Sequence, residues 1–343
     1  RAGALEVVVD TELTLIDVDG RLWFRGRDAT ELARFRSFEQ VAELLWDEHL
    51  AHTPWRSPGA MRHVCEDAQA ALPRDARPVE RMRVVAAAAG ATDPLRDDRR
   101  PAAVRAVGRT LIATIVDALP ERSPPRDSSI AARLWSRLAD APPSPAALNV
   151  LDAALVLLAD HELAASTLAA RAAASAWADP YMVVLTGMGA LGGALHGASS
   201  SAAEAMLASI DAPDAAGVAL GERLRADGRV PGFGHGVYRE RDPRADALLG
   251  VLPRAAAADR LAVVEEVVRL AGREGGPAPN VDFALAALSV GCHLRPGSAE
   301  AIFVLARVAG LIAHAIEEYP HRLRFRPRAA YTGPAPHVAP VGA

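Results

Sequence analysis

Histidine, arginine and glycine come together in the segment 230–239, which reads VPGFGHGVYR. Glycine lacks a Cβ atom, so the backbone beside His235 can approach a ligand closely. An imidazole can donate or accept a hydrogen bond and titrates near neutral pH. Arg244, which follows in the string DPR, offers a rigid pair of donors to a carboxylate. The segment therefore predicts a site for an anionic ligand, but a glycine-rich turn with a solvated histidine would show the same pattern.

Three further segments carry a histidine or an aspartate near the expected end of a helix. They are Asp160-His161-Glu162, Leu195-His196-Gly197 and Pro279-Asn280-Val281-Asp282. Each also fits a purely structural role, because aspartate is a common N-cap and glycine a common left-handed C-cap. In that interpretation Asp160 and Asp282 accept backbone N–H groups, and Gly197 ends the helix that precedes it.

Two arginine positions complete the set of candidate residues. Arg307 lies within the apolar segment 302–316, where its charge needs an anionic partner. A ligand or a carboxylate of the core could supply that partner. Arg326 lies in the run RFRPR at 324–328, which could equally be a solvated basic tail. Together, one carboxylate, paired imidazoles and several arginines could move a proton, polarise carbonyl groups and hold an acid with two or three negative charges.

Helices must position these residues, because apolar side chains recur at helical spacing along most of the chain. The spacing predicts helices over residues 31–35, 38–50, 79–89, 102–119, 131–139, 146–159, 163–178, 180–191, 201–210, 214–225, 245–251, 260–271, 283–291 and 298–318. A β-hairpin is expected before them, since polar and apolar residues alternate around Asp19-Gly20. The sequence predicts an all-α fold with a small N-terminal β-hairpin.

Composition excludes several classes of protein. The chain has no lysine among its 343 residues, so Schiff-base and Walker-A lysine chemistry are excluded. A net charge of −4 argues against general nucleic-acid binding. No apolar run approaches the ~20 uncharged residues expected of a membrane span. The two cysteines lack CxxC spacing, which is typical of a reduced, cytoplasmic protein.

One glycine pattern is misleading. Gly187, Gly189 and Gly192 match the GxGxxG pattern of dinucleotide-binding proteins. That pattern needs a preceding strand and a surrounding βαβ unit. The alanine-rich segment around these glycines is expected to be helical, so we interpret them as sites of close helix packing and a sharp helix end.

The chain resembles the citrate synthase family in the order and spacing of its motifs. The matching strings are FRGRD at 24–28, DHEL at 160–163, LHG at 195–197, GFGH at 232–235, DPR at 242–244, PNVD at 279–282 and RPR at 326–328. The resemblance implies a large helical domain (residues 1–199 and 299–343), a small helical domain (200–298) and a site in the cleft between them. It also implies a homodimer whose sites are completed across subunits, without a metal or a permanently bound cofactor.

The resemblance assigns a role to each candidate residue. Asp282 would remove a methyl proton from acetyl-CoA, His196 would stabilise the enol, and His235 would polarise the ketone of oxaloacetate. The oxaloacetate carboxylates would bind His161, Arg244, Arg307 and, from the partner subunit, Arg326. CoA would lie near Val230, Pro231, Gly232, Phe233, Gly234 and Arg239. The products would be citrate and CoA.

The chain departs from the usual family pattern around the expected pocket, at Ala164, Ala165, Ala194, Ala198, Ser199, Ser200, Gly236 and residues 283–286. These departures leave the acyl donor open, and a 2-methylcitrate synthase that uses propionyl-CoA is the alternative. One methylene changes selectivity by only ~1–3 kcal/mol. A non-catalytic paralogue that senses citrate or CoA is a further alternative. Residues 19–28 also resemble actinobacterial members with an upstream helix-turn-helix segment, which we state as a hypothesis.

Overall fold

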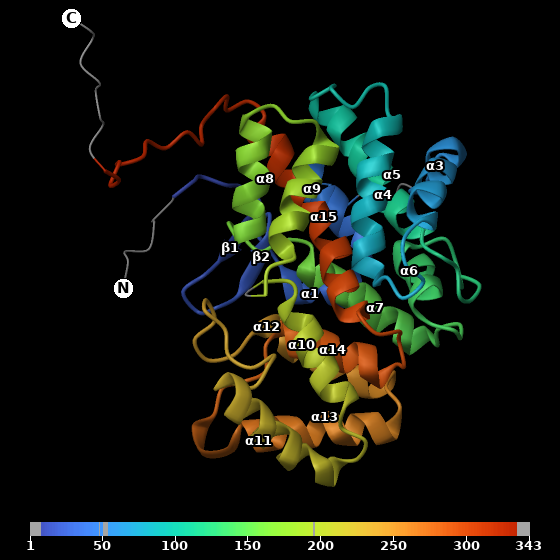
Figure 1. Ribbon diagram of the computed structural model, residues 1–343, viewed down its shortest axis with the longest axis vertical. Coiled ribbons are helices and arrows are strands. Elements are labelled where there is room, and N and C mark those ends of the chain that lie inside the picture. Colours follow the sequence, from blue (N-terminus) through green and yellow to red (C-terminus); the bar gives the residue numbers. More distant parts are fainter. Residues whose placement is uncertain (1–7, 48, 51–53, 195, 335–343) are drawn as a thin grey trace, which may run out of the picture.

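The computed structural model describes residues 8–47, 49–50, 54–194 and 196–334, and it confirms the all-α class (Figure 1). The helices are α1 (Ala29–Phe35), α2 (Phe38–Asp47), α3 (Gly59–Ala70), α4 (Pro78–Thr92), α5 (Pro101–Asp117), α6 (Ile130–Leu138), α7 (Pro145–Leu158), α8 (Ala165–Ser175), α9 (Pro180–Leu191), α10 (Ser199–Ala208), α11 (Ala216–Asp227), α12 (Pro243–Val251), α13 (Ala258–Ala271), α14 (Val281–Gly291) and α15 (Ser298–Glu318). Short 3₁₀ turns cover Pro213–Ala215, Leu252–Arg254 and Arg273–Gly275.

Helix α3 was not predicted from the sequence. Its buried side chains are Met61, Cys65 and Gln69, which are spaced by four residues and form one narrow face. Most positions between them are polar, with Val64 and Ala68 as the exceptions. The helix therefore buries few apolar side chains, and so few apolar residues gave too weak a signal to predict it from the sequence.

The expected N-terminal hairpin is confirmed, and it carries one more strand. Strand β1 (Thr14–Ile16) pairs antiparallel with β2 (Leu22–Phe24), which pairs with β3 (Arg27–Asp28). The turn forms because Gly20 adopts a φ of 76° and donates its N–H to Asp17 O. Strand β3 has only two residues and ends where Asp28 caps α1 by accepting from the N–H groups of Thr30 and Glu31.

Helix α15 is the centre of the fold and packs against α2, α4, α5, α7, α8, α9, α10 and α14. Among the described residues it is the one helix long and apolar enough to cross a membrane, with a mean hydropathy of 1.8. Of its apolar window, 94% is buried inside the fold, as in the core helix of a globular protein. Because α15 packs against so many helices, it carries apolar residues on all of its own sides.

The misleading glycine pattern lies in a helix, as predicted. Gly187 is in α9 and faces Leu311 of α15, whose Cδ1 would lie 2.6 Å from a Cβ atom at position 187. The missing side chain lets the two helices approach closely. Gly192 is the C-cap of α9. No strand precedes these glycines in the described segment between α8 and α9, so the requirement for a dinucleotide-binding unit is not met.

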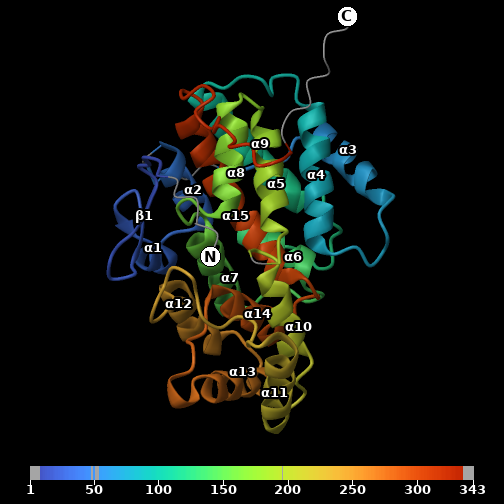
Figure 2. The same ribbon diagram turned by 60° about the vertical axis from the view of Figure 1, so that its left-hand side comes forward.

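Helices α10 to α14 gather at one end of the molecule, and the remaining helices lie towards the other end (Figure 2). Helix α10, the first of the group α10 to α14, begins at Ser199. Helix α15 begins at Ser298 and lies again among the remaining helices. These two points lie close to the domain boundaries expected from the resemblance, 199/200 and 298/299. The division into two domains at those residues stays a prediction.

Candidate active site

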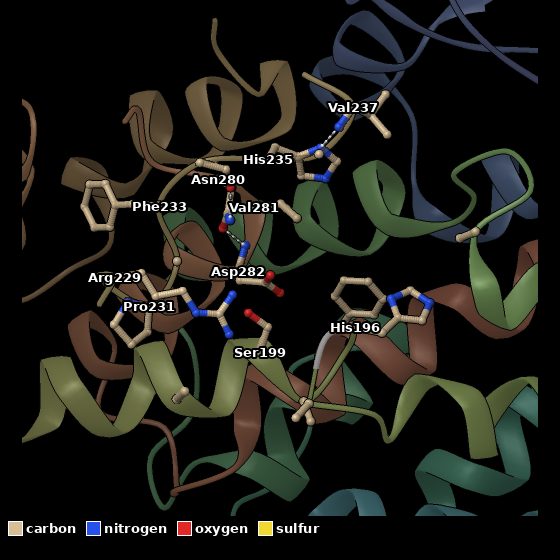
Figure 3. A pocket seen from close by; sticks show the side chains of 18 of the residues that line it. His196, Ser199, Arg229, Pro231, Phe233, His235, Val237, Asn280, Val281 and Asp282 are labelled. Atoms are coloured by element: carbon tan, nitrogen blue, oxygen red, sulfur yellow. Dashed lines mark hydrogen bonds between the residues drawn. The ribbon is translucent and has the colours of Figure 1, made fainter. Parts of the chain in front are cut away.

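A cavity of about 730 Å³ brings most of the candidate residues together (Figure 3). Its walls come from the segments before α8, α10, α12 and α14 and from α15. Candidates that line it are His161, His196, Val230, Pro231, Gly232, Phe233, Gly234, His235, Arg244, Asp282 and Arg307. Residues far apart in the sequence therefore share one space, in which a ligand could touch imidazole, carboxylate and guanidinium groups at once.

Asp282 lies in the first turn of α14, and its carboxylate faces the cavity (Figure 3). The proposal that it is an N-cap is wrong: Asn280 is the cap and accepts from the N–H groups of Asp282 and Phe283. The Oδ1 atom of Asp282 is buried and has no hydrogen-bond partner among the residues that the structure describes. Burial raises the pKa of Asp282 to about 6, against the opposing effects of Arg244 and the Ser199 hydroxyl. A carboxylate held this way is suited to accept a proton.

His196 lies in the turn between α9 and α10 rather than at the end of a helix. The interpretation of Gly197 as a left-handed C-cap is wrong, because α9 ends at Leu191 and is capped by Gly192 with a φ of −70°. The Nε2 atom of His196 lies 2.9 Å from the hydroxyl of Ser166. Burial, followed by the Arg307 charge, lowers the pKa of His196 to about 4. The ring is therefore neutral near pH 7 and can donate one hydrogen bond into the cavity.

The loop of His235 is attached to the start of α14. Gly232 and Gly234 have φ values of 83° and 78°, and a Cβ atom at position 232 would lie 2.7 Å from Phe283 Cβ. Asn280 donates its N–H to Gly232 O at 2.9 Å and its side-chain amide to Gly234 O at 2.7 Å. These contacts fix the loop beside Asp282, and they need glycine at both positions.

The hydrogen bonds of His235 determine its tautomer. Its Nδ1 accepts from the backbone N–H groups of Val237 and Tyr238, so the proton of the neutral ring lies on Nε2. Burial and the Arg244 charge lower the pKa of His235, which keeps the ring neutral. Arg244 Nη2 lies 3.3 Å from His235 Nε2. Since both groups are donors in this tautomer, they do not hydrogen-bond each other, and one ligand oxygen within reach of both could accept from each.

Arg244 and Arg307 bring two buried positive charges to the cavity. Arg244 is 2% exposed and pairs with Asp242 through Nε and Nη2, at 2.9 and 2.8 Å. Arg307 is 1% exposed and donates only through Nε, to Leu158 O at 3.0 Å. Its Nη1 and Nη2 have no hydrogen-bond partner among the described residues, and burial lowers its pKa to about 10 although the nearby charge of Asp160 opposes that shift. Arg307 thus feels a core carboxylate, but within the described part of the chain it forms no direct ion pair that would occupy these two nitrogens.

The Asp160-His161-Glu162 segment does not cap a helix, which corrects one sequence interpretation. Helix α8 begins later, at Ala165, without a side-chain cap. Asp160 is fully buried and accepts from Thr14 Oγ1 at 2.6 Å and from His314 Nε2 at 3.2 Å. This leaves His161 at the cavity wall, with its Nε2 3.0 Å from the hydroxyl of Tyr238.

Two predicted site residues lie outside the main cavity. Arg239 borders a smaller hollow of about 290 Å³, which also touches Gly234 and His235. Arg326 is exposed in the segment that follows α15, and that segment leads away from the helices in Figure 1. Among the described residues, neither Arg239 nor Arg326 lines the cavity that holds the other candidates.

Four residues of the site or its support were not predicted from the sequence: Ser166, Arg229, Tyr238 and Phe303. Ser199 was named only as a departure from the family pattern near the expected pocket. Arg229 and Ser199 lie beside Asp282, and Phe303 contacts His196 and Arg307 (Figure 3). Arg229 directly precedes the segment 230–239 that contains His235, and Tyr238 lies within it, so this segment indicated where both residues would lie. A serine or phenylalanine on a helix carries no comparable signal.

Comparison with known proteins identifies the family. The family model described as "Citrate synthase, C-terminal domain" matches residues 4–328. The chain belongs to the citrate synthase family. The citrate synthase of Haloferax volcanii is 32% identical over 95% of this chain and 94% of its own length. The 2-methylcitrate synthase of Mycobacterium tuberculosis is 30% identical over 99% of this chain and 92% of its own.

Solved citrate synthases share the fold of this family member. The enzyme of Thermotoga maritima aligns with a TM-score of 0.78 at 24% identity, over 97% of this chain and 95% of its own. A ternary complex of carboxymethyl coenzyme A and oxaloacetate with the Thermoplasma acidophilum enzyme aligns with a TM-score of 0.76 at 25% identity, over 98% and 96%. Family membership supports a transferase that carries out citrate synthase-type condensation.

Proposed function

We propose that the protein condenses acetyl-CoA with oxaloacetate to give citrate and CoA. The observation that carries this proposal is the buried guanidinium of Arg307, whose Nη1 and Nη2 have no hydrogen-bond partner among the described residues, in the same cavity as Asp282 and two neutral imidazoles. A buried cation without a partner is costly unless an anionic ligand binds it. Oxaloacetate has two carboxylates, and His161, Arg244 and Arg307 are the residues we expect to hold them.

In the first step, Asp282 takes a proton from the methyl group of acetyl-CoA. A thioester methyl is a very weak acid, so the charge that develops on the thioester oxygen must be stabilised as it forms. His196 is neutral and uses Nε2 for Ser166, which leaves Nδ1 to donate to that oxygen. Removal of one such donor typically raises the barrier by ~3–4 kcal/mol.

In the second step, the enol carbon attacks the ketone carbon of oxaloacetate. The new carbon–carbon bond moves an electron pair onto the ketone oxygen, and His235 Nε2–H donates its proton there to give the hydroxyl of citryl-CoA. The proton that Asp282 took from the methyl group then restores His235, so the addition neither gains nor loses a proton. Water then cleaves the thioester, releasing citrate and the CoA thiol. The backbone of residues 230–234 and the Arg239 side chain are expected to lie along the bound CoA, since both border the hollows beside His235.

Ser199 offers a test of how the base is tuned. Its hydroxyl hydrogen-bonds Asp282 and favours the ionised form, so Ser199→Ala should raise the pKa of Asp282 further. The base works only when ionised; therefore the acid limb of the kcat/KM profile should move to higher pH, by about 0.5–1 unit. Ser201→Ala is the matched control, because Ser201 bonds Glu300 instead. An acid limb that stays in place would remove Ser199 from this role.

Arg326 tests the proposed homodimer. We expect Arg326 to reach the oxaloacetate site of the partner subunit, so Arg326→Ala should weaken oxaloacetate binding. Mixing Arg326→Ala with Asp282→Asn chains would give hybrid dimers in which one of the two sites is intact. After subunit exchange, activity should recover to about a quarter of the wild-type value. Hybrid dimers that remain inactive would contradict a site shared between subunits.

The acyl donor has one alternative, propionyl-CoA, which would make the protein a 2-methylcitrate synthase. The similarity to the Mycobacterium tuberculosis enzyme supports it, and so do five alanines in the cavity wall: Ala164, Ala165, Ala194, Ala198 and Ala202. These short side chains leave room for a larger acyl group. Neither observation separates donors that differ by one methylene.

A thiol-release assay over a panel of acyl-CoAs and 2-oxo acids tests the proposal. We expect the highest kcat/KM with acetyl-CoA and oxaloacetate; a higher value with propionyl-CoA would select the alternative. Binding of oxaloacetate without thiol release from any pair would instead identify a non-catalytic paralogue that senses citrate or CoA. We also propose a cytoplasmic location, which fractionation of the source cells would test.

A further inference from the structure

Tyr238 contacts both histidines on one side of the cavity and is only 4% exposed. Its hydroxyl lies 3.0 Å from His161 Nε2, and its backbone N–H donates to His235 Nδ1 at 3.2 Å. The ring centroids of the three residues lie 4.8 to 5.7 Å apart. One residue of the segment before α12 therefore holds two imidazoles, one of which belongs to the segment before α8.

Tyr238 lies next to the main cavity but outside its wall. It does not line the cavity that contains Asp282 and Arg307, and it borders instead the smaller hollow beside Arg239. A ligand in the main cavity would touch the histidines and not the phenol ring. Any effect of the Tyr238 hydroxyl on the reaction must therefore pass through His161, its hydrogen-bond partner.

The protonation states of the two partners limit the possible arrangements. Burial and the charges of Arg244 and Arg307 hold the pKa of His161 well below its usual value, so the ring is neutral. Burial raises the pKa of Tyr238 to about 12, so its hydroxyl keeps the proton. A neutral imidazole has one N–H group. If Tyr238 donates to Nε2, that N–H group is Nδ1–H; if Nε2 donates to Tyr238, Nδ1 is a bare lone pair.

The surroundings favour Tyr238 as the donor. The guanidinium carbon of Arg244 lies 5.2 Å from the centroid of the Tyr238 ring. A positive charge beside the ring makes the phenol a better donor. Within the described residues, Nε2 is the ring nitrogen of His161 that is engaged in a hydrogen bond. The Nδ1 atom is left for the cavity, where a lone pair would repel an anionic ligand and an N–H group would bind it.

We propose that Tyr238 is a positioning residue that fixes His161 in the Nδ1–H tautomer, so that His161 donates to a carboxylate of the bound oxo acid. This inference rests on the proposed function for the identity of the anion. The tautomer itself is a property of the ligand-free protein. Removing the hydroxyl should weaken binding of the oxo acid and leave the acyl-CoA side of the site unchanged.

Steady-state kinetics of Tyr238→Phe test the role in binding. The KM for oxaloacetate should rise about tenfold, equivalent to ~1.4 kcal/mol, while the KM for acetyl-CoA stays within about twofold. Tyr319→Phe is the matched control, because its buried hydroxyl donates to Ala178 O away from the cavity. An unchanged KM for oxaloacetate, or equal rises for both substrates, would overturn the proposal.

Nuclear magnetic resonance of the full-length protein with ¹⁵N-labelled histidine tests the tautomer without turnover. His161→Gln identifies the His161 signals. In the wild type the proton should lie on Nδ1, and in Tyr238→Phe the two tautomers should mix. His235 is an internal control, because its partner is the backbone N–H of residue 238, which the substitution keeps. A wild-type proton on Nε2 of His161 would overturn the proposal, even if the thiol-release assay fails or the variant does not fold.

Discussion

Arg307→Met should strongly weaken binding of the oxo acid without making the fold less stable. The side chain is 1% exposed, and two of its three guanidinium nitrogens have no hydrogen-bond partner among the described residues. The nearby charge of Asp160 offsets burial only in part, since the pKa of Arg307 is still lowered to about 10. Replacing a buried charge by an apolar chain of similar volume is often neutral or stabilising. Losing a buried charge contact to a carboxylate costs ~2–5 kcal/mol, so we expect oxaloacetate affinity to fall by about 30-fold to several thousand-fold.

Calorimetric titration and the midpoint of thermal unfolding measure the two parts of this prediction. Arg171→Met is the matched control, because Arg171 is also fully buried but is bonded to His314, Glu317 and Glu318. Breaking that network should destabilise the fold by ~3–5 kcal/mol. A large loss of stability in Arg307→Met would mean that Arg307 has a structural partner, and its role in ligand binding would be contradicted.

Asp282→Asn should lower kcat about 10³-fold, because general-base catalysis contributes ~10²–10⁴ and an amide cannot accept the proton. Burial raises the pKa of Asp282 to about 6, so the folded protein favours the neutral carboxyl more than the unfolded chain does. The neutral amide should therefore leave the free energy of unfolding unchanged or slightly higher. Thiol release measures the first effect and urea denaturation the second.

Asp227→Asn is the control for Asp282→Asn, because Asp227 also brings a carboxylate to the cavity wall but is exposed at the end of α11. We expect it to change kcat less than about twofold. Oxaloacetate should still bind to Asp282→Asn with nearly wild-type affinity. If the two variants have similar kcat values, the catalytic base is another group.

The sequence predicts the helices and the main site residues well where the signal is local. A high density of apolar residues defines α9 and α15, and a broad apolar face defines α5. The glycines around Phe233 indicate a loop in which the backbone approaches a neighbour, and the structure shows that contact with Phe283. These patterns depend on the chemistry of single residues and their immediate neighbours.

Capping roles could not be predicted, because several neighbouring residues compete for the same backbone N–H groups. Asn280 and Asp282 are both good caps, and only the start of the helix at Val281 decides in favour of Asn280. Asp160 has the side chain of a cap, but Thr14 and His314 bind it in the core. Those partners are 146 and 154 residues away in the sequence, so no local pattern reveals them.

Long-range contacts also explain what the sequence missed in the site. Tyr238 meets His161 only because the segments before α8 and α12 are packed together, and the tautomer depends on that contact. Arg307 could be recognised as a buried charge from its apolar neighbours, but its lack of a partner depends on every helix around α15. The places expected for Arg239 and Arg326 depend on CoA and on a second subunit, so they stay predictions.

A crystal structure with oxaloacetate and carboxymethyl-CoA would test the central claim most directly, namely that Asp282, His196 and His235 act on one reacting centre. We predict the carboxymethyl group within about 2.6–3.2 Å of Asp282 and His196, and the oxaloacetate ketone oxygen at the same range from His235 Nε2. The oxaloacetate carboxylates should lie on Arg244 and Arg307. A complex in which any of the three side chains points away from both ligands would contradict the account.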